Sequence, residues 1–512
     1  MASSTDRRVW TPRLLALAAV VGTGGLSFIG TGLTPLPWAT WFAPLPILLL
    51  APRVSAKLAA SAAGLAWLIG ELNLASYLVT DIGMPVGLVI GLFVGLALVF
   101  AGVVVLARAL ILRRRYQAAA VAVPAAWVAA EYGFATASPD GAFWSLAYTQ
   151  ADLLPVLQVA SVTGYYGITF LLMLVPTAMA VLAAPGASTV VRWRVGVATA
   201  AVLLLSVGFG LVRPPARDAD GPTERIALVA VRQDGGRLDL ATPEGTAMLQ
   251  AYLAQVRGVT EAGARTVVLP EAVLKVDVGS LSIVDGPMQR LADETGARIV
   301  FGLGVIDPAA GTIDGRPGGY NTARVYAPNA PARTYHKQHL IVTERYRPGS
   351  SLLLGSLNEQ FTWAVAICKD LDFPELARAN RSAGMDVMLV PAWDFDRDGW
   401  LHSRMAIMRG VETGATIARA ARSGALTISD PWGRVLVEER TGEQAFVTAT
   451  ADVPLRSTST PATRLGPWFA WLCAALLVAA VGLLLRRQPS DVPPATAMAE
   501  PPLAPVTATS SM

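Results

Sequence analysis

The chain has 512 residues, of which 53% are hydrophobic and only 15% are charged. Since soluble proteins usually carry about 25% charged residues, this composition excludes a wholly soluble protein and indicates a membrane part, with room for one soluble domain of about 100–250 residues. The net charge of +4 does not indicate nucleic-acid binding, because the basic residues cluster beside apolar segments.

Eight apolar runs reach or approach the roughly 20 helical residues that cross a bilayer. The first run follows Arg13 in the position of a signal peptide, but further apolar runs follow it directly, so we interpret it as a retained helix. The second and fifth runs are short. The predicted spans are residues 14–33, 38–50, 58–74, 86–112, 118–132, 157–182, 195–212 and 468–485.

Basic residues fall in alternate loops between these runs, whereas the loops around residues 76–85 and 135–155 contain no Lys or Arg. Cytoplasmic loops of membrane proteins carry the excess of Lys and Arg. The basic loops and the amino terminus are therefore predicted to be cytoplasmic, which places the segment after the seventh run outside the cytoplasm. The basic loop residues are Arg53, Lys57, Arg113, Arg114, Arg115, Arg192, Arg194, Arg486 and Arg487.

The central part of the chain changes to alternating strand and helix patterns. Runs such as RIALVAV, RTVVLP and DVMLVPA predict strands, and residues near 243–262, 287–295 and 402–413 predict amphipathic helices. This order predicts a sheet-rich α/β domain. The tail is rich in Pro, Ala, Thr and Ser and is predicted to be disordered and cytoplasmic. The predicted parts are a membrane domain (1–213), an α/β domain (214–464), a C-terminal transmembrane helix (465–487) and the tail (488–512).

The segment TWAVAICKDLDFP (residues 362–374) predicts a buried strand that delivers Cys368 to a sharp exit. Two further chemical groups lie just beyond strand patterns or in a loop: Glu271 follows VVLP, and Lys337 lies in TYHKQHLIVTERY. A thiol, a carboxylate and an ammonium are the groups needed for acyl transfer through a thioester. Because the other cysteine, Cys473, lies in the last apolar run, Cys368 is predicted to be unpaired.

In the order Glu271, Lys337, Cys368 the chain resembles the nitrilase superfamily, and with its membrane segments it resembles the apolipoprotein N-acyltransferase family. The motifs that carry this resemblance are LPE, YHKQHLIVTE, AICKD, HSRMAIMRGVETGATIARAARSGALTISDPWGR and GAFWSLAYTQADLLPVLQVASVTGYYGITFL. The resemblance implies a multi-span α-helical membrane domain and a nitrilase-like α-β-β-α sandwich. It also implies transfer of an acyl chain from a phospholipid, through a cysteine thioester, to the α-amino group of the diacylglyceryl-cysteine that begins a lipoprotein.

The resemblance further implies a role for each group of the site. Glu271 is the base that takes the thiol proton. Lys337 stabilises the oxyanion of the tetrahedral intermediate, together with the backbone N–H of Lys369. Glu344 matches a second acid of the family and is expected to orient Lys337 or to share proton handling with Glu271.

Relatives usually carry Tyr and Glu directly after the nucleophile, whereas this chain has Lys369 and Asp370. We expect these two residues to bind substrate and to affect its choice, and we expect the Lys369 cation to lower the pKa of Cys368. In the membrane part, Tyr148 and Gln150 lie near the outer boundary. They are either interface anchors or, as the resemblance implies, part of the lipid path.

Other interpretations of these patterns stay open. A Glu after a strand is often a solvated loop residue, and a lone cysteine is often a buried apolar one. The spacing of His336 and His339 could chelate a metal, but no third ligand stands at a recognisable spacing, so no metal site is predicted. His402 is expected to cap or pack a helix.

Two alternative functions also fit the sequence: a membrane-tethered nitrilase-type amidase that hydrolyses small amides, and a non-catalytic scaffold that binds lipid or lipoprotein. The amidase does not explain the whole pattern, because a soluble amide gives no reason for eight spans, whereas the Lys369 substitution leaves the scaffold conceivable. We expect no cofactor and no nucleic-acid partner. We also expect a monomer in the plasma (inner) membrane, with the α/β domain on its periplasmic side.

Overall fold

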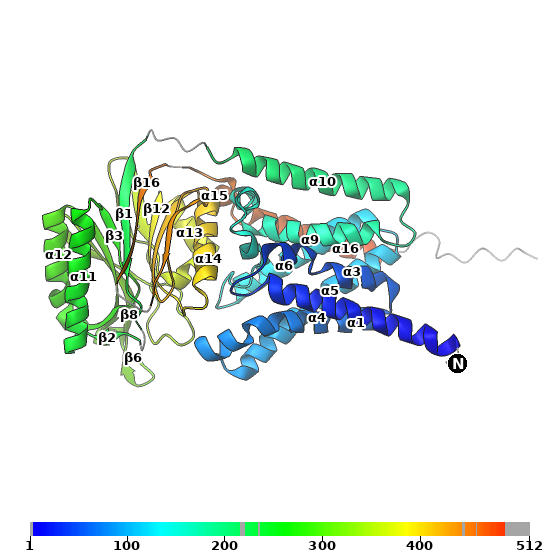
Figure 1. Cartoon of the computed structure of the whole chain (residues 1–512), viewed down its shortest axis with the longest axis horizontal. Helices are drawn as coiled ribbons and strands as arrows, with labels where there is room; N and C mark the ends of the chain where they lie inside the picture. The colour runs from blue at the N-terminus through cyan, green and yellow to red at the C-terminus, as the bar shows by residue number, and fades with distance from the viewer. Residues whose placement is uncertain (1–3, 216–220, 234–235, 443–445, 457, 487–512) are drawn as a thin grey trace, which may run out of the picture.

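The computed structural model describes residues 4–215, 221–233, 236–442, 446–456 and 458–486. Figure 1 shows two parts placed end to end, a helical bundle and a sheet-rich domain, with the amino terminus at the far end of the bundle. Within these ranges seven helices are long and apolar enough to cross a membrane. They are α1 (Ser4–Gly30), α4 (Ala56–Ser76), α5 (Val86–Leu112), α6 (Tyr116–Ala137), α9 (Tyr165–Leu182), α10 (Thr189–Val212) and α16 (Trp468–Leu485).

The predicted second span is not one helix. It consists of α2 (Pro37–Phe42), α3 (Leu45–Leu50) and the 3-10 turn η1 (Ala51–Arg53). Pro44 and Pro46 interrupt it, since proline lacks the N–H that a continuous helix would use. The broken segment still joins the two ends of the bundle. Trp41 donates to Gln150 at the end beside the sheet-rich domain, and Arg53 donates to the carbonyl of Ala183, directly after α9, at the other end. The described chain thus crosses the bundle eight times, seven of them in long helices.

The predicted sixth span is also shorter than expected. Residues 154–163 form two short helices, α7 (Leu154–Leu157) and α8 (Ala160–Thr163), which lie at the end of the bundle. Gly164 has a φ of +66° and so separates α8 from α9, a backbone conformation that glycine adopts without strain. Gln158 then donates to the carbonyl of Trp432 in the sheet-rich domain, at 2.8 Å. This region therefore joins the two parts of the chain.

Two sheets pack face to face in the sheet-rich domain, and helices cover the outer face of each (Figure 1). The first sheet has the order β16 (Val447–Pro454), β1 (Thr223–Ala230), β3 (Thr266–Val268), β5 (Arg298–Ile306), β4 (Leu274–Asp277), β2 (Leu238–Asp239), with β8 (Gly319–Ala327) paired to β5 and β9 (Ala330–His336) paired to β8. The second has the order β10 (Leu354–Ser356), β11 (Thr362–Val365), β12 (Val387–Trp393), β13 (Thr416–Arg422), β14 (Ala425–Ser429), β15 (Val435–Arg440). A small separate hairpin is formed by β6 (Thr312–Ile313) and β7 (Arg316–Pro317).

The four layers confirm the predicted α-β-β-α sandwich. The covering helices are α11 (Pro243–Glu261) and α12 (Leu281–Thr295) on the first sheet, and α13 (Pro374–Ser382) and α14 (Gly399–Thr413) on the second. Apolar strand residues such as Ile226, Val365 and Ile428 fill the space between the sheets. The sandwich therefore has the core that its buried strand patterns predicted.

Helix α14 is buried on nearly all sides because it lies between the second sheet and the bundle. Its Met405 and Met408 pack against Tyr148 and Leu157 of the bundle. The helix begins at Gly399, so His402 does not open it as predicted. The predicted helix at 287–295 likewise begins earlier, at Leu281.

Candidate active site

The three groups expected to carry the chemistry come from three strand ends. Cys368 begins the short 3-10 helix η6 (Cys368–Asp372) after β11, Glu271 follows β3, and Lys337 follows β9. These strands belong to both sheets, and their ends meet where the sandwich faces the bundle. The structure brings all three side chains, with Glu344, to the wall of one pocket of about 380 Å³.

The backbone at two of these strand ends is strained. Cys368 has a φ of +45° and Ala272, next to Glu271, a φ of +47°. Non-glycine residues rarely adopt this region, at a cost of about 1–3 kcal/mol each, and such strain concentrates at functional sites. Gly302 on β5 makes the second turn possible, since a Cβ there would lie 2.3 Å from the carbonyl oxygen of Pro270. The sharp exit predicted for Cys368 is thus a left-handed turn.

A buried polar cluster holds the two carboxylates and the ammonium together. Lys337 Nζ lies 2.8 Å from Glu271 Oε1 and 2.9 Å from Glu344 Oε2. Asn321 on β8 donates from its Nδ2 to Oε1 of both carboxylates, at 2.6 Å in each case. Glu271 Oε2 has no hydrogen-bond partner among the described residues. One oxygen of Glu271 is therefore free to accept a proton.

Electrostatics within this cluster set the charge of each partner. Burial alone would lower the pKa of Lys337, but the Glu271 and Glu344 carboxylates reverse this effect and hold that pKa well above its ordinary value. Burial, reinforced by the Glu271 carboxylate, raises the pKa of the Cys368 thiol well above its ordinary value. At neutral pH the site thus contains a cationic lysine and a protonated thiol that needs a base.

The residue after the nucleophile does not act on the thiol as expected. Lys369 forms an ion pair with Asp140, which belongs to the bundle, and both line the pocket. Burial and the Glu271 carboxylate raise the pKa of the Cys368 thiol and the Lys369 charge is paired with Asp140, so the expected lowering of that pKa by Lys369 does not prevail. Lys369 is nevertheless placed where it can contact a substrate.

Asp370 lies on the opposite side of the η6 turn, fully buried and outside the pocket wall. Its carboxylate accepts hydrogen bonds from the Tyr335 hydroxyl at 2.7 Å and from the backbone N–H groups of His339 and Ile367, both at 2.9 Å. It therefore ties the loop after Lys337 to the nucleophile turn. We revise its expected role from substrate contact to positioning.

The two membrane-part candidates also lie away from this pocket. Gln150 is fully buried and holds the broken second crossing, donating to the Pro37 carbonyl at 3.0 Å and accepting from Trp41. Tyr148 accepts a hydrogen bond from the buried Arg409 of α14 at 3.1 Å. The structure therefore gives Gln150 a packing role and places Tyr148 at a neighbouring pocket.

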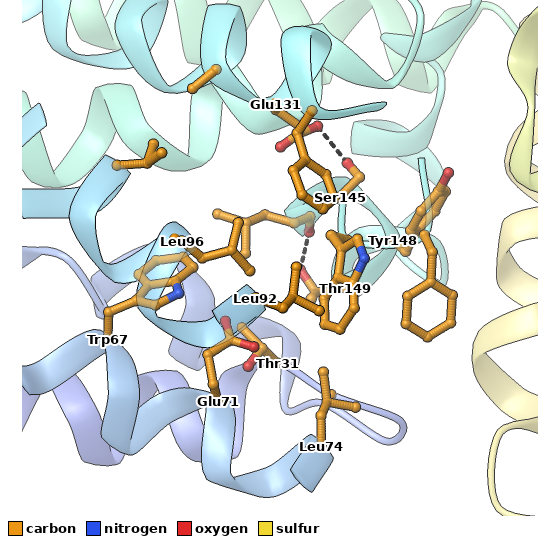
Figure 2. A pocket seen from close by; sticks show the side chains of 18 of the residues that line it. Thr31, Trp67, Glu71, Leu74, Leu92, Leu96, Glu131, Ser145, Tyr148 and Thr149 are labelled. Atoms are coloured by element: carbon orange, nitrogen blue, oxygen red, sulfur yellow. Dashed lines mark hydrogen bonds between the residues drawn. The ribbon is translucent and has the colours of Figure 1, made fainter. Parts of the chain in front are cut away.

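That neighbouring pocket, also about 380 Å³, lies inside the bundle and is shown in Figure 2. Trp67 and Glu71 reach it from α4 and Glu131 from α6, where Ser145 donates to Glu131 at 2.7 Å. Most of its remaining wall is apolar. Both pockets share two lining residues, Phe143 and Trp144, so the bundle pocket lies directly beside the pocket of Cys368.

The wall of the Cys368 pocket that faces the bundle carries a further polar group of residues. Tyr77, which follows α4, donates to Asp398 at 2.6 Å, and His402 lies 3.2 Å from the same carboxylate. Burial opposes the charge of His402, but Asp398 reverses this effect and raises the pKa of His402 to about 9. The expected packing role of His402 is therefore incomplete, since its side chain is a cation that lines the pocket.

No three His, Cys, Asp or Glu side chains in the described ranges are arranged to hold a metal ion. His336 stacks on Tyr320 with ring centroids 4.1 Å apart, and His339 stacks on Phe373 at 3.6 Å. The two histidines therefore pack against different aromatic rings and do not share a common ligand position.

Sequence reasoning missed Asn321, Asp140 and Asp372 as members of this site. Asn321 lies in the strand GYNTARVYA, where an amide is unusual among apolar residues and could have been noticed. Asp140 lies in a loop of the membrane part and carries no local signal. Asp372 ends the CKDLD turn, where Asp370 drew attention instead.

Comparisons with known proteins agree with both parts of this architecture. Residues 23–178 match the family described as "Apolipoprotein N-acyltransferase N-terminal domain", and residues 225–460 match "Carbon-nitrogen hydrolase". An apolipoprotein N-acyltransferase of Geobacter metallireducens is 27% identical over 505 residues, covering 90% of this chain and 93% of that protein. One of Rhodopseudomonas palustris is 26% identical over 391 residues, covering 67% and 69%. A solved structure, Saccharomyces cerevisiae Nit3 of the nitrilase superfamily, covers 45% of this chain and 90% of its own length at 20% identity, with a TM-score of 0.38.

Proposed function

The chain belongs to the apolipoprotein N-acyltransferase family, and from this premise we propose that it moves an acyl chain from a phospholipid, through a thioester on Cys368, to the α-amino group of the N-terminal diacylglyceryl-cysteine of lipoproteins. One observation carries the proposal. The pocket that contains Cys368, Glu271 and Lys337 takes part of its wall from the membrane bundle, including Leu78 and Met84. Lipid substrates can therefore reach the thiol without leaving the bilayer region.

The first half-reaction forms the thioester. Glu271 takes the proton of the Cys368 thiol through its free Oε2, and the sulfur attacks the carbonyl carbon of a phospholipid ester. The ester C–O bond then breaks, and Glu271 returns the proton to the leaving glycerol oxygen. The products are a lysophospholipid and an acylated Cys368.

Lys337 and the backbone N–H of Lys369 stabilise the tetrahedral intermediate. One well-placed donor of this kind contributes about 3–4 kcal/mol to the transition state. Glu344 and Asn321 hold Lys337 and Glu271 in place through the hydrogen bonds of the buried cluster. We therefore assign Glu344 the orienting role that the resemblance implied.

The second half-reaction transfers the acyl chain. The neutral amine of the acceptor attacks the thioester carbonyl and the C–S bond breaks. Glu271 takes a proton from the attacking nitrogen and passes it to the sulfur of Cys368, which restores the thiol. The apolar walls of the pocket keep water from the thioester until the acceptor arrives.

The placement of the protein follows from its helices and its family. It is a membrane protein with seven long apolar helices in the described ranges. We propose that the end of the bundle with the basic loops faces the cytoplasm and that the sandwich of residues 214–464 faces the periplasm, in the inner membrane, as a monomer. The predicted tail at residues 488–512 lies outside the described residues.

The intermediate itself tests the proposal. Purified enzyme given phospholipid without an acceptor should release one lysophospholipid per site and gain the mass of one acyl chain on the peptide that contains Cys368. Neutral hydroxylamine should remove this mass. Cys368→Ala should not gain it, Glu271→Gln should gain it far more slowly, and Cys473→Ala, which alters a cysteine buried in the bundle, should gain it normally.

Each alternative function predicts a different result. An amidase would hydrolyse short amides and never acquire the acyl mass from phospholipid. A non-catalytic scaffold would bind lipid without releasing lysophospholipid. Either result would contradict the proposed function.

A further inference from the structure

One carboxylate in the pocket of Cys368 has no counter-charge of its own. The other charged groups at the pocket pair as follows: Lys337 with Glu271 and Glu344, Arg237 with Glu344, Lys369 with Asp140, and His402 with Asp398. Asp372 also lines the pocket and is only 3% exposed. Its side chain makes no hydrogen bond and no ion pair with any residue in the part of the chain that the structure describes.

The position of Asp372 relative to the nucleophile is fixed by the backbone. Asp372 is the last residue of the η6 turn that Cys368 begins. Its own carbonyl accepts from the N–H of Ala142 in the bundle at 2.8 Å. Asp372 is therefore held four residues beyond Cys368 in the same short helix, at the seam between the two parts of the chain.

The surroundings leave this carboxylate short of positive charge. Burial raises the pKa of Asp372, and the nearby charges of His402 and Lys369 oppose this only in part, because each is already paired with another carboxylate. The other charged or titratable groups that act on it are Asp140, Lys337, Tyr77 and Tyr148. A buried carboxylate in this state gains most from a cation that a substrate brings with it.

We propose that Asp372 binds the α-ammonium group of the acceptor lipoprotein and takes its first proton. This inference rests on the proposed function, because it names the residue that prepares the second substrate of that reaction. An α-ammonium group has an ordinary pKa of about 7.7–8.0 and must lose a proton before it can attack a thioester. The ammonium is also the group by which the acceptor differs chemically from a neutral acyl chain.

The proton steps then divide between two carboxylates. The ammonium gives one proton to Asp372 and becomes a neutral amine, whose nitrogen bonds to the thioester carbonyl carbon. As the C–S bond breaks, the nitrogen gives a second proton to Glu271, which passes it to the sulfur of Cys368. The products are an amide and a free thiol, and Asp372 releases its proton to water.

An ammonium could also come from the headgroup of a donor phospholipid, and the two half-reactions separate these sources. The first half-reaction is measured as the lysophospholipid burst from vesicles of phosphatidylethanolamine, which carries an ammonium, or phosphatidylglycerol, which does not. The second is measured by mixing the acylated enzyme with a diacylated lipopeptide that has a free amino terminus. Transfer is normalised to the burst, so that only folded, loaded sites are counted.

Asp372→Asn keeps the shape of the side chain and removes its charge. We expect the ratio of transfer rate to loading rate to fall by about 30-fold or more, the loss that accompanies removal of one partner of a buried charge pair. Asp372→Glu should recover part of this ratio. Asp277→Asn, which changes an exposed aspartate at the end of β4 and outside the pocket wall, should leave both rates unchanged.

A charged analogue gives a second, independent measurement. A lipopeptide whose α-nitrogen carries three methyl groups keeps a positive charge and cannot be acylated, so it should inhibit transfer in the wild type more strongly than its neutral N-acetyl counterpart. This preference should disappear in Asp372→Asn.

Several results would overturn the inference. If Asp372→Asn transferred the acyl chain at the wild-type rate, Asp372 would bind neither substrate. If Asp372→Asn lost the lysophospholipid burst, or loaded more slowly from phosphatidylethanolamine alone, Asp372 would act on the donor. Absence of a burst in the wild type would instead refute the proposed function.

Discussion

Asn321 provides a test of how the proposed base and the oxyanion-stabilising lysine are held together. It is fully buried on β8 and donates to both Glu271 and Glu344 at 2.6 Å. The substitution Asn321→Asp preserves the size of the side chain. It removes both donated hydrogen bonds and places a third carboxylate beside the other two, which already share the charge of Lys337 and, 3.7 Å from Glu344, that of Arg237.

The expected change in the pKa values of the cluster follows from the charges and the distance between them. Two like charges about 4 Å apart repel by about 4 kcal/mol at the effective dielectric constant of a protein, which corresponds to about three pKa units. One carboxylate of the cluster would then keep a proton near neutral pH. At about pH 8, above that shifted pKa, the introduced carboxylate is ionised, so the cluster has lost both donated hydrogen bonds and a like charge faces Glu271 and Glu344. Loading of Cys368 should therefore slow by about 100- to 1,000-fold near pH 8.

The loading rate of Asn321→Asp should depend on pH in a definite direction. The repulsion raises the pKa of the introduced carboxylate, so this group is protonated below that pKa and can again donate one hydrogen bond. Relative to the wild type, Asn321→Asp should therefore recover activity as the pH falls from about 8 to about 6. The assay is the rate of the lysophospholipid burst across this range.

Asn321→Ala serves as the matched comparison, because it loses the two hydrogen bonds without adding a charge. Its rate relative to the wild type should not recover at low pH. The reasoning would be refuted if Asn321→Asp loaded at the wild-type rate, or if both variants showed the same pH profile.

Two further predictions concern the seam between the parts and their placement in the membrane. Lys369→Ala and Asp140→Ala should each lower the thermal stability of the protein in detergent. The exchanged pair, Lys369→Asp with Asp140→Lys, should recover part of the lost stability. If the variant with both alanine changes loses the sum of the two single losses, the ion pair contributes nothing to stability. A reporter fused after Pro215 should behave as external and one at the carboxyl terminus as cytoplasmic, whereas the same location for both would contradict the assigned topology.

Some features of the site are visible in the sequence because they depend only on local pattern. An apolar strand that ends at a reactive side chain marks Cys368 and Glu271, whatever the rest of the chain does. Alternating basic loops predict the common end of the bundle, and the structure places Arg53 and Arg113 there, at the carbonyls of Ala183 and Leu484. Helix ends were harder to predict, since Pro44 and Gly164 each break a run that is mostly apolar.

Other features were decided only by the tertiary structure. Glu271 and its partner Asn321 are 50 residues apart, and Lys369 and Asp140 are 229 residues apart. No local pattern pairs such residues, because hydrogen-bond partners depend on how the strands of the sandwich align and on how it docks against the bundle. By itself the sequence determined which groups can react; only the packing of the two parts decided which charges are paired and left Asp372 without a partner, because a buried charge is satisfied or unsatisfied by whatever the fold places beside it.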